Sequence, residues 1–223
     1  MKIDRLSLAV AALCLAGVVA VYGLLPETVP IHWDAAGQID SWGPRWNLLA
    51  LGALPLACVV LFRLLPLIDP RRESYERHAK TYGTIERLTV TVLAALVWVS
   101  AAAALGAGFD IGAIVRTLSG LLFVGLGNFM GRIKRNYFVG IKTPWALADD
   151  EVWRLTHRRG GLVFIAMGLV YIATLALPPG PALAIVFGAG TVGGIAYIYL
   201  YSYLCWRHLR GRGNAPASEE REP

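Results

Sequence analysis

Six long apolar stretches constrain this chain more than any other feature of its sequence. A helix needs about 20 residues to cross a hydrocarbon layer about 30 Å thick, and each stretch is close to or above that length. Backbone groups that face lipid must bond within the protein, which favours helices. The sequence therefore predicts an all-α membrane protein, a bundle of six transmembrane helices. The stretches cover residues 6–25, 46–68, 88–109, 111–130, 162–177 and 181–206.

The charges are few and unevenly distributed along the chain. Only 16% of the residues are charged, against about 25% in soluble domains. Nearly all of the 21 basic residues lie before the first stretch, between the second and third, between the fourth and fifth, or after the sixth. The positive-inside rule then places both termini in the cytoplasm. This basic excess suits anionic lipid headgroups, and we predict no direct contact with nucleic acid.

The sequence contains no phosphate loop, no dinucleotide fingerprint and no cysteines at ligand spacing, so we predict no cofactor and no resident metal.

The apolar stretches and the distribution of charge divide the chain into four parts. The parts are residues 1–68, with two helices and an extracytoplasmic loop at 26–45; a cytoplasmic connector at 69–87; residues 88–206, with four helices and a cytoplasmic loop at 131–161; and a tail at 207–223 that is disordered by composition.

The outer loop is rich in tryptophan and proline. Its prolines discourage a helix, and residues 28–33 suit a short extended segment. His32, Asp34 and Asp40 supply one nitrogen and two carboxylates, so a metal site is one interpretation, although local turn caps are the more common use of such aspartates. The residues of this loop that we expect to face an external partner are His32, Trp33, Asp34, Asp40 and Trp42.

The inner loop contains two helix starts. Thr143 and Pro144 have the pattern of an N-cap followed by proline, and Asp149 begins a second helix that Gly160 would end. This pattern predicts an amphipathic helix at the cytoplasmic interface. Trp145 and Trp153 have two interpretations: they anchor this helix at the interface, or they belong to a motif that binds a partner.

One histidine of this second helix has two interpretations. His157 fits a hydrogen-bonded structural histidine better than a general base, because no serine or cysteine nucleophile stands in an activating arrangement. Asp149 and His157 share a helix face, which leaves metal binding open.

Arg116 is the one charge well inside a predicted span, about 9 Å from its outer end. A central arginine costs at least about 2.5 kcal/mol, so it either reaches outward to Asp110 or to lipid headgroups, or lines a functional cavity. Glycines at 127, 131, 188, 190, 193 and 194 are spaced for close helix contact, within the bundle or in a homo-oligomer.

The inner loop resembles the signature of the SdpI/YfhL family of bacterial membrane proteins. Lys142 stands where that signature has arginine. The outer segment is similar to a small domain of unknown function that is often joined to the family's N-terminus, at Leu25, Pro26, Val29, Pro30, His32, Gly37 and Asp40. The signature positions are Gly127, Asn128, Asn136, Phe138, Gly140, Ile141, Thr143, Pro144, Trp145, Trp153, Thr156, His157 and Arg158.

The resemblance implies a non-enzymatic immunity and signalling protein of the bacterial inner membrane. Such a protein protects its producer from a secreted antimicrobial peptide and holds a cytoplasmic repressor at the membrane. The outer loop would then face the toxin, and the inner loop would face the repressor. Two alternatives stay open: a metal-dependent membrane hydrolase that uses the His and Asp residues named above, and a small transporter with Arg116 in its path.

Overall fold

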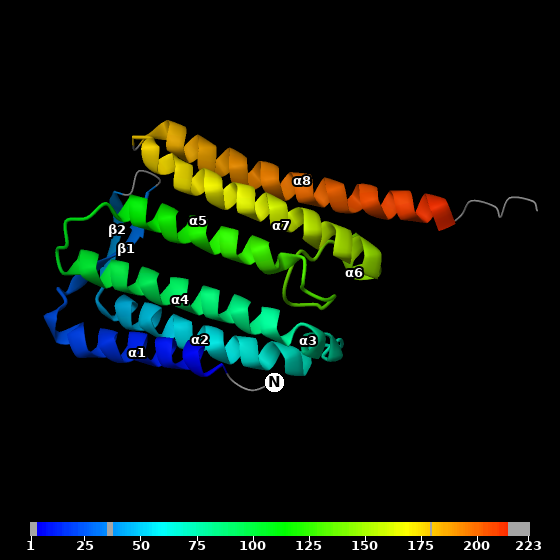
Figure 1. Ribbon diagram of the computed structural model, residues 1–223. Coiled ribbons are helices and arrows are strands. Elements are labelled where there is room, and N and C mark those ends of the chain that lie inside the picture. The colour runs from blue at the N-terminus through cyan, green and yellow to red at the C-terminus, as the bar shows by residue number, and fades with distance from the viewer. Residues whose placement is uncertain (1–3, 35–37, 179, 214–223) are drawn as a thin grey trace, which may run out of the picture.

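The computed structural model describes residues 4–34, 38–178 and 180–213, and most of them are helical. Six helices are long and apolar enough to cross a membrane, which confirms the predicted fold class. The first three, α1, α2 and α4, pack against one another; α5 and α8 pack against α7; and α4 meets α5 between the two groups (Figure 1). The six are α1 (Arg5–Val21), α2 (Trp46–Ile68), α4 (Ala79–Ala104), α5 (Ile111–Met130), α7 (Asp150–Ala173) and α8 (Pro181–Gly213).

A two-stranded hairpin covers one end of the bundle, which we call the hairpin end. Strand β1 (Thr28–Trp33) pairs antiparallel with β2 (Ile39–Pro44), and the register shifts after Pro30. The extended segment predicted at 28–33 is therefore confirmed as β1. The second strand was not predicted, because its Gly43-Pro44 ending is typical of a turn.

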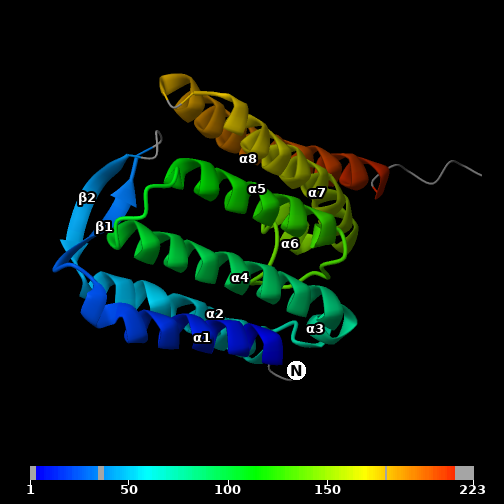
Figure 2. The ribbon, with the colours of Figure 1, turned by 60° about the vertical axis from the view of Figure 1, so that its left-hand side comes forward.

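The hairpin is fixed to the bundle by apolar side chains. Leu25 and Val29 are buried in a cluster with Val18 of α1, Leu48 of α2 and Val97 of α4. A short 3-10 turn, η1 (Tyr22–Leu24), leads from α1 into this cluster. Figure 2 shows that β1 lies nearer than β2 to the ends of α4 and α5. The described part of the outer loop, residues 26–34 and 38–45, is thus an ordered cap.

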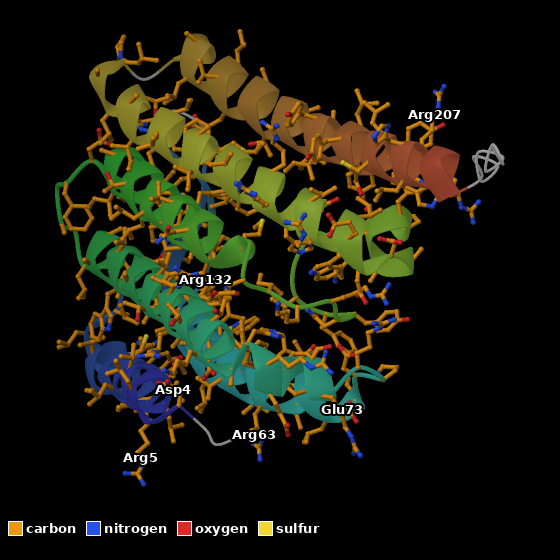
Figure 3. All side chains as sticks on the ribbon, turned by 45° about the vertical axis from the view of Figure 1, so that its right-hand side comes forward. Asp4, Arg5, Arg63, Glu73, Arg132 and Arg207 are labelled. Atoms are coloured by element: carbon orange, nitrogen blue, oxygen red, sulfur yellow. The ribbon has the colours of Figure 1, made fainter. Side chains whose placement is uncertain are left out.

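The opposite end of the bundle, which we call the motif end, holds two short helices. They are α3 (Glu73–Arg77), which precedes α4, and α6 (Pro144–Ala148), which precedes α7. The first described turn of α1 and the last turn of α8 lie at this same end (Figure 1). In Figure 3 the labelled side chains Arg5, Glu73 and Arg207 point away from the bundle.

Helix α7 differs from the predicted interfacial helix. It begins at Asp150 as expected, but it continues through Gly160 and Gly161 to Ala173, and η2 (Thr174–Ala176) follows. The prediction that Gly160 ends a helix is therefore wrong. A Cβ on Gly161 would lie 2.6 Å from the carbonyl oxygen of Gly127 in α5, and a Cβ on Gly127 would lie 2.6 Å from that of Gly161. These glycines allow two backbones to touch, and they do not stop the helix.

Other boundaries also move. Helix α4 begins at Ala79 and not near residue 88, and α8 continues to Gly213. Residues 207–213 of the predicted disordered tail are therefore helical, and the remainder of that tail lies outside the described residues. Of the α8 glycines, Gly194 meets Met167 of α7, whereas Gly188, Gly190 and Gly193 face open space.

Candidate functional site

Asn136 organises the turn that follows α5. Its side chain is fully buried, and its amide nitrogen donates to the carbonyls of Lys134 and Val139, both at 2.9 Å. Its amide oxygen accepts from the backbone N–H groups of Phe138 at 2.9 Å and Val139 at 2.7 Å. Every polar atom of this amide is used within the protein, so Asn136 holds the turn in one conformation.

Asp69, at the end of α2, joins the connector to this turn. It is buried, and its carboxylate accepts from the hydroxyl of Tyr75 at 2.8 Å and from the N–H of Tyr137 at 2.9 Å. The Tyr75 hydroxyl also lies 3.3 Å from the amide oxygen of Asn136. Burial, followed by the hydrogen bond to Asp69, raises the pKa of Tyr75, so the hydroxyl keeps its proton and can donate.

Sequence reasoning missed Asp69 and Tyr75. The connector has i,i+4 charge pairs, such as Glu73 with Arg77, and such pairs in a sequence indicate an exposed, solvated helix. A buried aspartate among basic residues has no local pattern that separates it from an exposed one. The one available signal was the Asp69-Pro70 pair directly after an apolar span, which indicates a fixed helix end.

His157 connects α7 to the loop before α6. Its Nε2 accepts from the N–H of Ile141 at 3.0 Å, so the proton of the neutral ring is on Nδ1, which lies 2.9 Å from the carbonyl oxygen of Trp153. Gly140, with φ of +116°, lets the chain pass directly over this ring, where a Cβ would collide with Nε2. Both ring nitrogens are thus engaged, as the structural interpretation of His157 predicted.

Trp153 is buried beside this histidine. The two rings stack with centroids 3.9 Å apart, and the indole N–H donates to the carbonyl of Ile133 at 2.9 Å. Of the two interpretations of Trp153, this geometry disfavours the interfacial anchor, since the indole is buried and its N–H is used inside the protein. Asp149 caps α7 by accepting from Glu151 and Val152, at 2.8 and 2.9 Å.

Thr143 ties the motif to α8. As predicted, it is the N-cap of α6, with Pro144 at the first position, and its hydroxyl accepts from the N–H of Ala146 at 3.1 Å. The same hydroxyl lies 2.5 Å from that of Ser202, and both side chains are fully buried. A hydrogen bond between two buried hydroxyls fixes α6 against α8 without charge.

The remaining signature residues have varied positions. Trp145 is partly buried beside Tyr203, with ring centroids 5.2 Å apart. Phe138 is partly buried, whereas Asn128 and Arg158 are exposed. Thr156 is fully buried, and its hydroxyl has no hydrogen-bond partner among the described residues. Three bonded groups thus lie at the motif end: Asn136 with Tyr75 and Asp69, His157 with Trp153 and the chain at Gly140, and Thr143 with Ser202. We call these residues, apart from Ser202, the motif network.

A basic cleft of about 510 Å³ opens beside the motif network. Three ion pairs form its wall: Arg135 Nε to Asp150 Oδ1 at 2.6 Å, Arg71 Nη1 to the same oxygen at 4.0 Å, and a two-point pair between Arg154 and Glu151. Basic residues still outnumber acidic ones there, so the cleft suits an acidic surface. Its charged residues are Arg71, Arg77, Lys134, Arg135, Asp150, Glu151 and Arg154.

His32, Asp40 and Trp42 lie exposed on the hairpin. His32 Nδ1 is 2.6 Å from Asp40 Oδ1 across the two strands, and Trp42 is 57% exposed. Asp34 accepts from the N–H of Gln38 at 2.8 Å, as a turn cap does. Within the described part of the chain, no group of three or more His, Cys, Asp or Glu side chains is placed to hold a metal ion.

Arg116 lines a cavity of about 360 Å³ beneath the hairpin. The side chain is only 5% exposed, and none of the ion pairs among the described residues includes it. Asp110, the partner considered for it, accepts from the N–H of Ala113 at 2.8 Å and caps α5. The burial of Arg116 therefore favours the interpretation that it lines a cavity over the one in which its side chain reaches outward to Asp110.

Comparison with known protein families matches two separate parts of the chain. Residues 132–202 match the SdpI/YfhL protein family. That segment holds most of the motif network, and the predicted resemblance is confirmed. Residues 9–55, which include the hairpin, match a domain of unknown function (DUF1648).

The similarity to a curated relative extends over nearly the whole chain. The Immunity protein SdpI of Bacillus subtilis (strain 168) is 22% identical over 211 residues, which are 95% of this chain and 99% of that protein. No solved structure matches. Together with the six apolar helices, this similarity identifies a multi-pass membrane protein related to an immunity protein.

Proposed function

We propose that this chain is a membrane immunity and signal-transduction protein that protects its cell from a secreted antimicrobial peptide. The observation that carries the proposal is the alignment, over nearly the full length of both chains, with a protein named as an immunity protein. The two matched regions, residues 9–55 and 132–202, are joined by the helices between them. Helix α4 packs against α1 and α2 of the first region, and α5 packs against α4 and against α7 of the second. Both parts that such a role would use therefore belong to one bundle.

The hairpin end is the side proposed to meet the toxin. The basic clusters lie at the motif end, and the positive-inside rule would place that end in the cytoplasm and the hairpin outside. The hairpin presents His32, Asp40 and Trp42 on its exposed surface. An ordered cap with an exposed tryptophan suits recognition of a peptide, since aromatic side chains dominate many binding surfaces.

The motif end is the side proposed to hold a cytoplasmic regulator. The buried side chains of the motif network bond mainly to backbone groups of the loop and of α7, which supports a bracing role for them. The accessible chemistry at this end is the basic cleft, where Arg77 and Lys134 lie beside the ion pairs of Asp150 and Glu151. A repressor with an acidic surface would be a complementary partner.

Survival of a sensitive indicator strain tests the proposal. Cells that express the protein are challenged with a culture supernatant of its native host that is first shown to kill cells carrying an empty vector. We expect at least 10-fold more survivors with the protein present, at a membrane level confirmed by immunoblot. Equal killing of both strains by that supernatant would refute the immunity role.

A second experiment addresses the regulator. Soluble proteins are captured from toxin-exposed cells with the wild-type protein and with a variant that carries Arg71→Glu and Arg77→Glu. We expect a repressor to be retained by the wild type alone. Equal retention by both proteins would show that the basic cleft is not its docking surface.

A further inference from the structure

His78 lies at the junction of α3 and α4, where the chain leaves one helix and enters the next. Its backbone angles, φ of −130° and ψ of 27°, are not helical, so the two helices meet at a bend. Its side chain is only 5% exposed. A change in this buried ring therefore acts on the direction in which α3 leaves α4.

One nitrogen of the His78 ring has a partner and the other has none. Nδ1 lies 2.6 Å from the carbonyl oxygen of Ser74, so the proton of the neutral ring is on Nδ1 and donates to that oxygen. Nε2 is shielded from solvent and has no hydrogen-bond partner among the described residues. A proton added at Nε2 would make a buried, charged donor without an acceptor, which folded proteins nearly always avoid.

Two tyrosines flank the ring and are already engaged elsewhere. Tyr75 of α3 and Tyr82 of α4 have ring centroids 5.4 and 6.2 Å from that of His78. The Tyr75 hydroxyl donates to the carboxylate of Asp69, and the Tyr82 hydroxyl donates to the carbonyl of Phe62. The side chains packed on the ring thus supply no negative charge of their own.

The turn after α5 adds a positive charge near this ring. Burial lowers the pKa of His78, the bond to the Ser74 carbonyl opposes this effect, and the charge of Lys134 lowers the pKa again. A charged ring is therefore poorly accommodated in the docked position, and movement of the ring toward water would relieve both the missing acceptor and the repulsion.

Helix α3 forms part of the basic cleft. Ser74 and Arg77 line the cleft together with residues of the turn after α5 and of the first turns of α7. Helix α3 has only five residues, so its position depends on side-chain bonds such as that of His78 to the Ser74 carbonyl. Departure of the ring breaks this bond and alters one wall of the cleft.

We propose that His78 is an acid-sensitive switch that displaces α3 and changes the basic cleft when the pH at the motif end falls. At neutral pH the ring is docked, and Ser74 and Arg77 keep their places in the cleft wall. Below pH about 6.5, uptake of a proton favours the displaced ring, which reaches water. This inference rests on the proposed function in one respect: the cleft is the surface proposed to hold the regulator, which acid would then release.

Distances between spin labels across the cleft test the inference. The labels are attached to Glu76→Cys on α3 and Arg158→Cys on α7, both exposed positions, after the three native cysteines are replaced by alanine. The purified full-length protein is measured in phosphatidylcholine nanodiscs by pulsed electron paramagnetic resonance at pH 7.5, 6.5 and 5.5. We expect a second distance in acid, whose ratio to the first rises at least about 3-fold from pH 6.5 to 5.5; one proton allows at most about 10-fold. An unchanged distance distribution would overturn the inference.

Variants assign the response to this ring. We expect no acid-induced distance in His78→Gln, whose amide N–H can still donate to Ser74 but does not titrate. Lys134→Gln removes the repelling charge, so the change should occur at a higher pH than in the wild type. His208→Gln is the matched control, because His208 is an exposed histidine of α8, and its response should equal that of the wild type. A full acid response in His78→Gln would refute the switch.

Two further comparisons keep the outcome decisive. If His78→Gln does not fold, the midpoint of Lys134→Gln decides, and a midpoint equal to that of the wild type would count against the role of His78. Displacement of α3 in acid without capture of any regulator at neutral pH would refute the docking role of the cleft alone. Retention of a regulator by a cleft whose label distance does not respond to pH would refute the switch alone.

Discussion

At the scale of single residues, the motif network is explained by the satisfaction of buried polar groups. Asn136 uses both ends of its amide, and Asp69 takes donors from two separate segments. Loss of one member leaves several buried donors unpaired, each at a cost of about 1–3 kcal/mol. The side chains at these positions therefore fix the conformation of the loop, and this is their primary role.

Replacement of Asn136 by alanine tests this account. It leaves the N–H groups of Phe138 and Val139 without their acceptor, so we expect the free energy of unfolding in mixed micelles to fall by about 3 kcal/mol. The control is Asn128→Ala, an exposed signature residue on α5, for which we expect a change below about 0.5 kcal/mol. Similar effects of the two changes would contradict the assigned role of Asn136.

His78 gives the motif end a dependence on pH. Burial lowers its pKa below the ordinary value of 6.5, because a charged ring would be poorly solvated there. The unfolded chain then takes up the proton more readily, so stability is full above pH about 6.5 and is lost as the pH falls below it. His157 is the other buried ring at this end, and its Nε2 accepts from the N–H of Ile141.

We therefore expect the free energy of unfolding to decrease between pH 7.5 and pH 5.5. The decrease should be smaller in His78→Gln, which removes one of the two buried rings. Unfolding titrations of both proteins at the two pH values measure this. An identical pH dependence in the variant would show that His78 does not contribute.

At the scale of elements, the close contact of α5 with α7 determines how the motif network is positioned. Gly120 and Gly127 of α5 face Gly168 and Gly161 of α7, with each Cβ position close to a carbonyl of the other helix. Such small residues permit the van der Waals contact on which helix association in a bilayer depends. The turn that holds Asn136 begins where these two helices meet.

A bulky residue in this contact should force the helices apart. We expect Gly161→Val to destabilise the protein by about 3 kcal/mol, because its side chain has no space beside the Gly127 carbonyl. Gly188→Val on α8, where the Cβ position is open, should change the free energy of unfolding by less than about 0.5 kcal/mol. Thermal unfolding of both variants in detergent measures this difference. A lower stability of Gly188→Val than of Gly161→Val would contradict the role assigned to Gly161 in the contact of α5 with α7.

Sequence patterns predicted the elements better than their contacts. Hydropathy located six helices, and the Thr143-Pro144 and Asp149 patterns located two helix starts, because these signals are local. The prediction that Gly160 ends the helix is wrong because a glycine at a helix contact and a glycine at a helix end look alike in sequence. The link from Asp69 to Tyr137 crosses 68 positions, and no local pattern carries such information.

At the scale of the whole molecule, the bundle separates two surfaces. The hairpin end holds the exposed His32, Asp40 and Trp42, and the motif end holds the basic cleft. The helices between them expose apolar side chains, such as Leu13, Leu121 and Val192, as lipid contact requires. This arrangement suits a protein that detects a molecule on one side of a membrane and responds on the other.

Cysteine labelling of intact cells tests which end lies outside. In a background where Cys14, Cys58 and Cys205 are replaced by alanine, Asp40→Cys and Glu73→Cys each introduce one exposed thiol. A maleimide that does not cross membranes should label Asp40→Cys in intact cells and Glu73→Cys only after lysis. The opposite pattern would place the hairpin in the cytoplasm and remove it from contact with a secreted peptide.

The most direct test of the central claim compares protection per inserted molecule in variants of the two ends. Survival under toxin challenge, divided by the membrane level of the protein, is measured for the wild type, for His32→Ala with Trp42→Ala, and for Asn136→Ala. The account predicts that the hairpin variant inserts normally but loses protection at least 10-fold, whereas Asn136→Ala loses protection only as far as its membrane level falls. Full protection by the hairpin variant would contradict it.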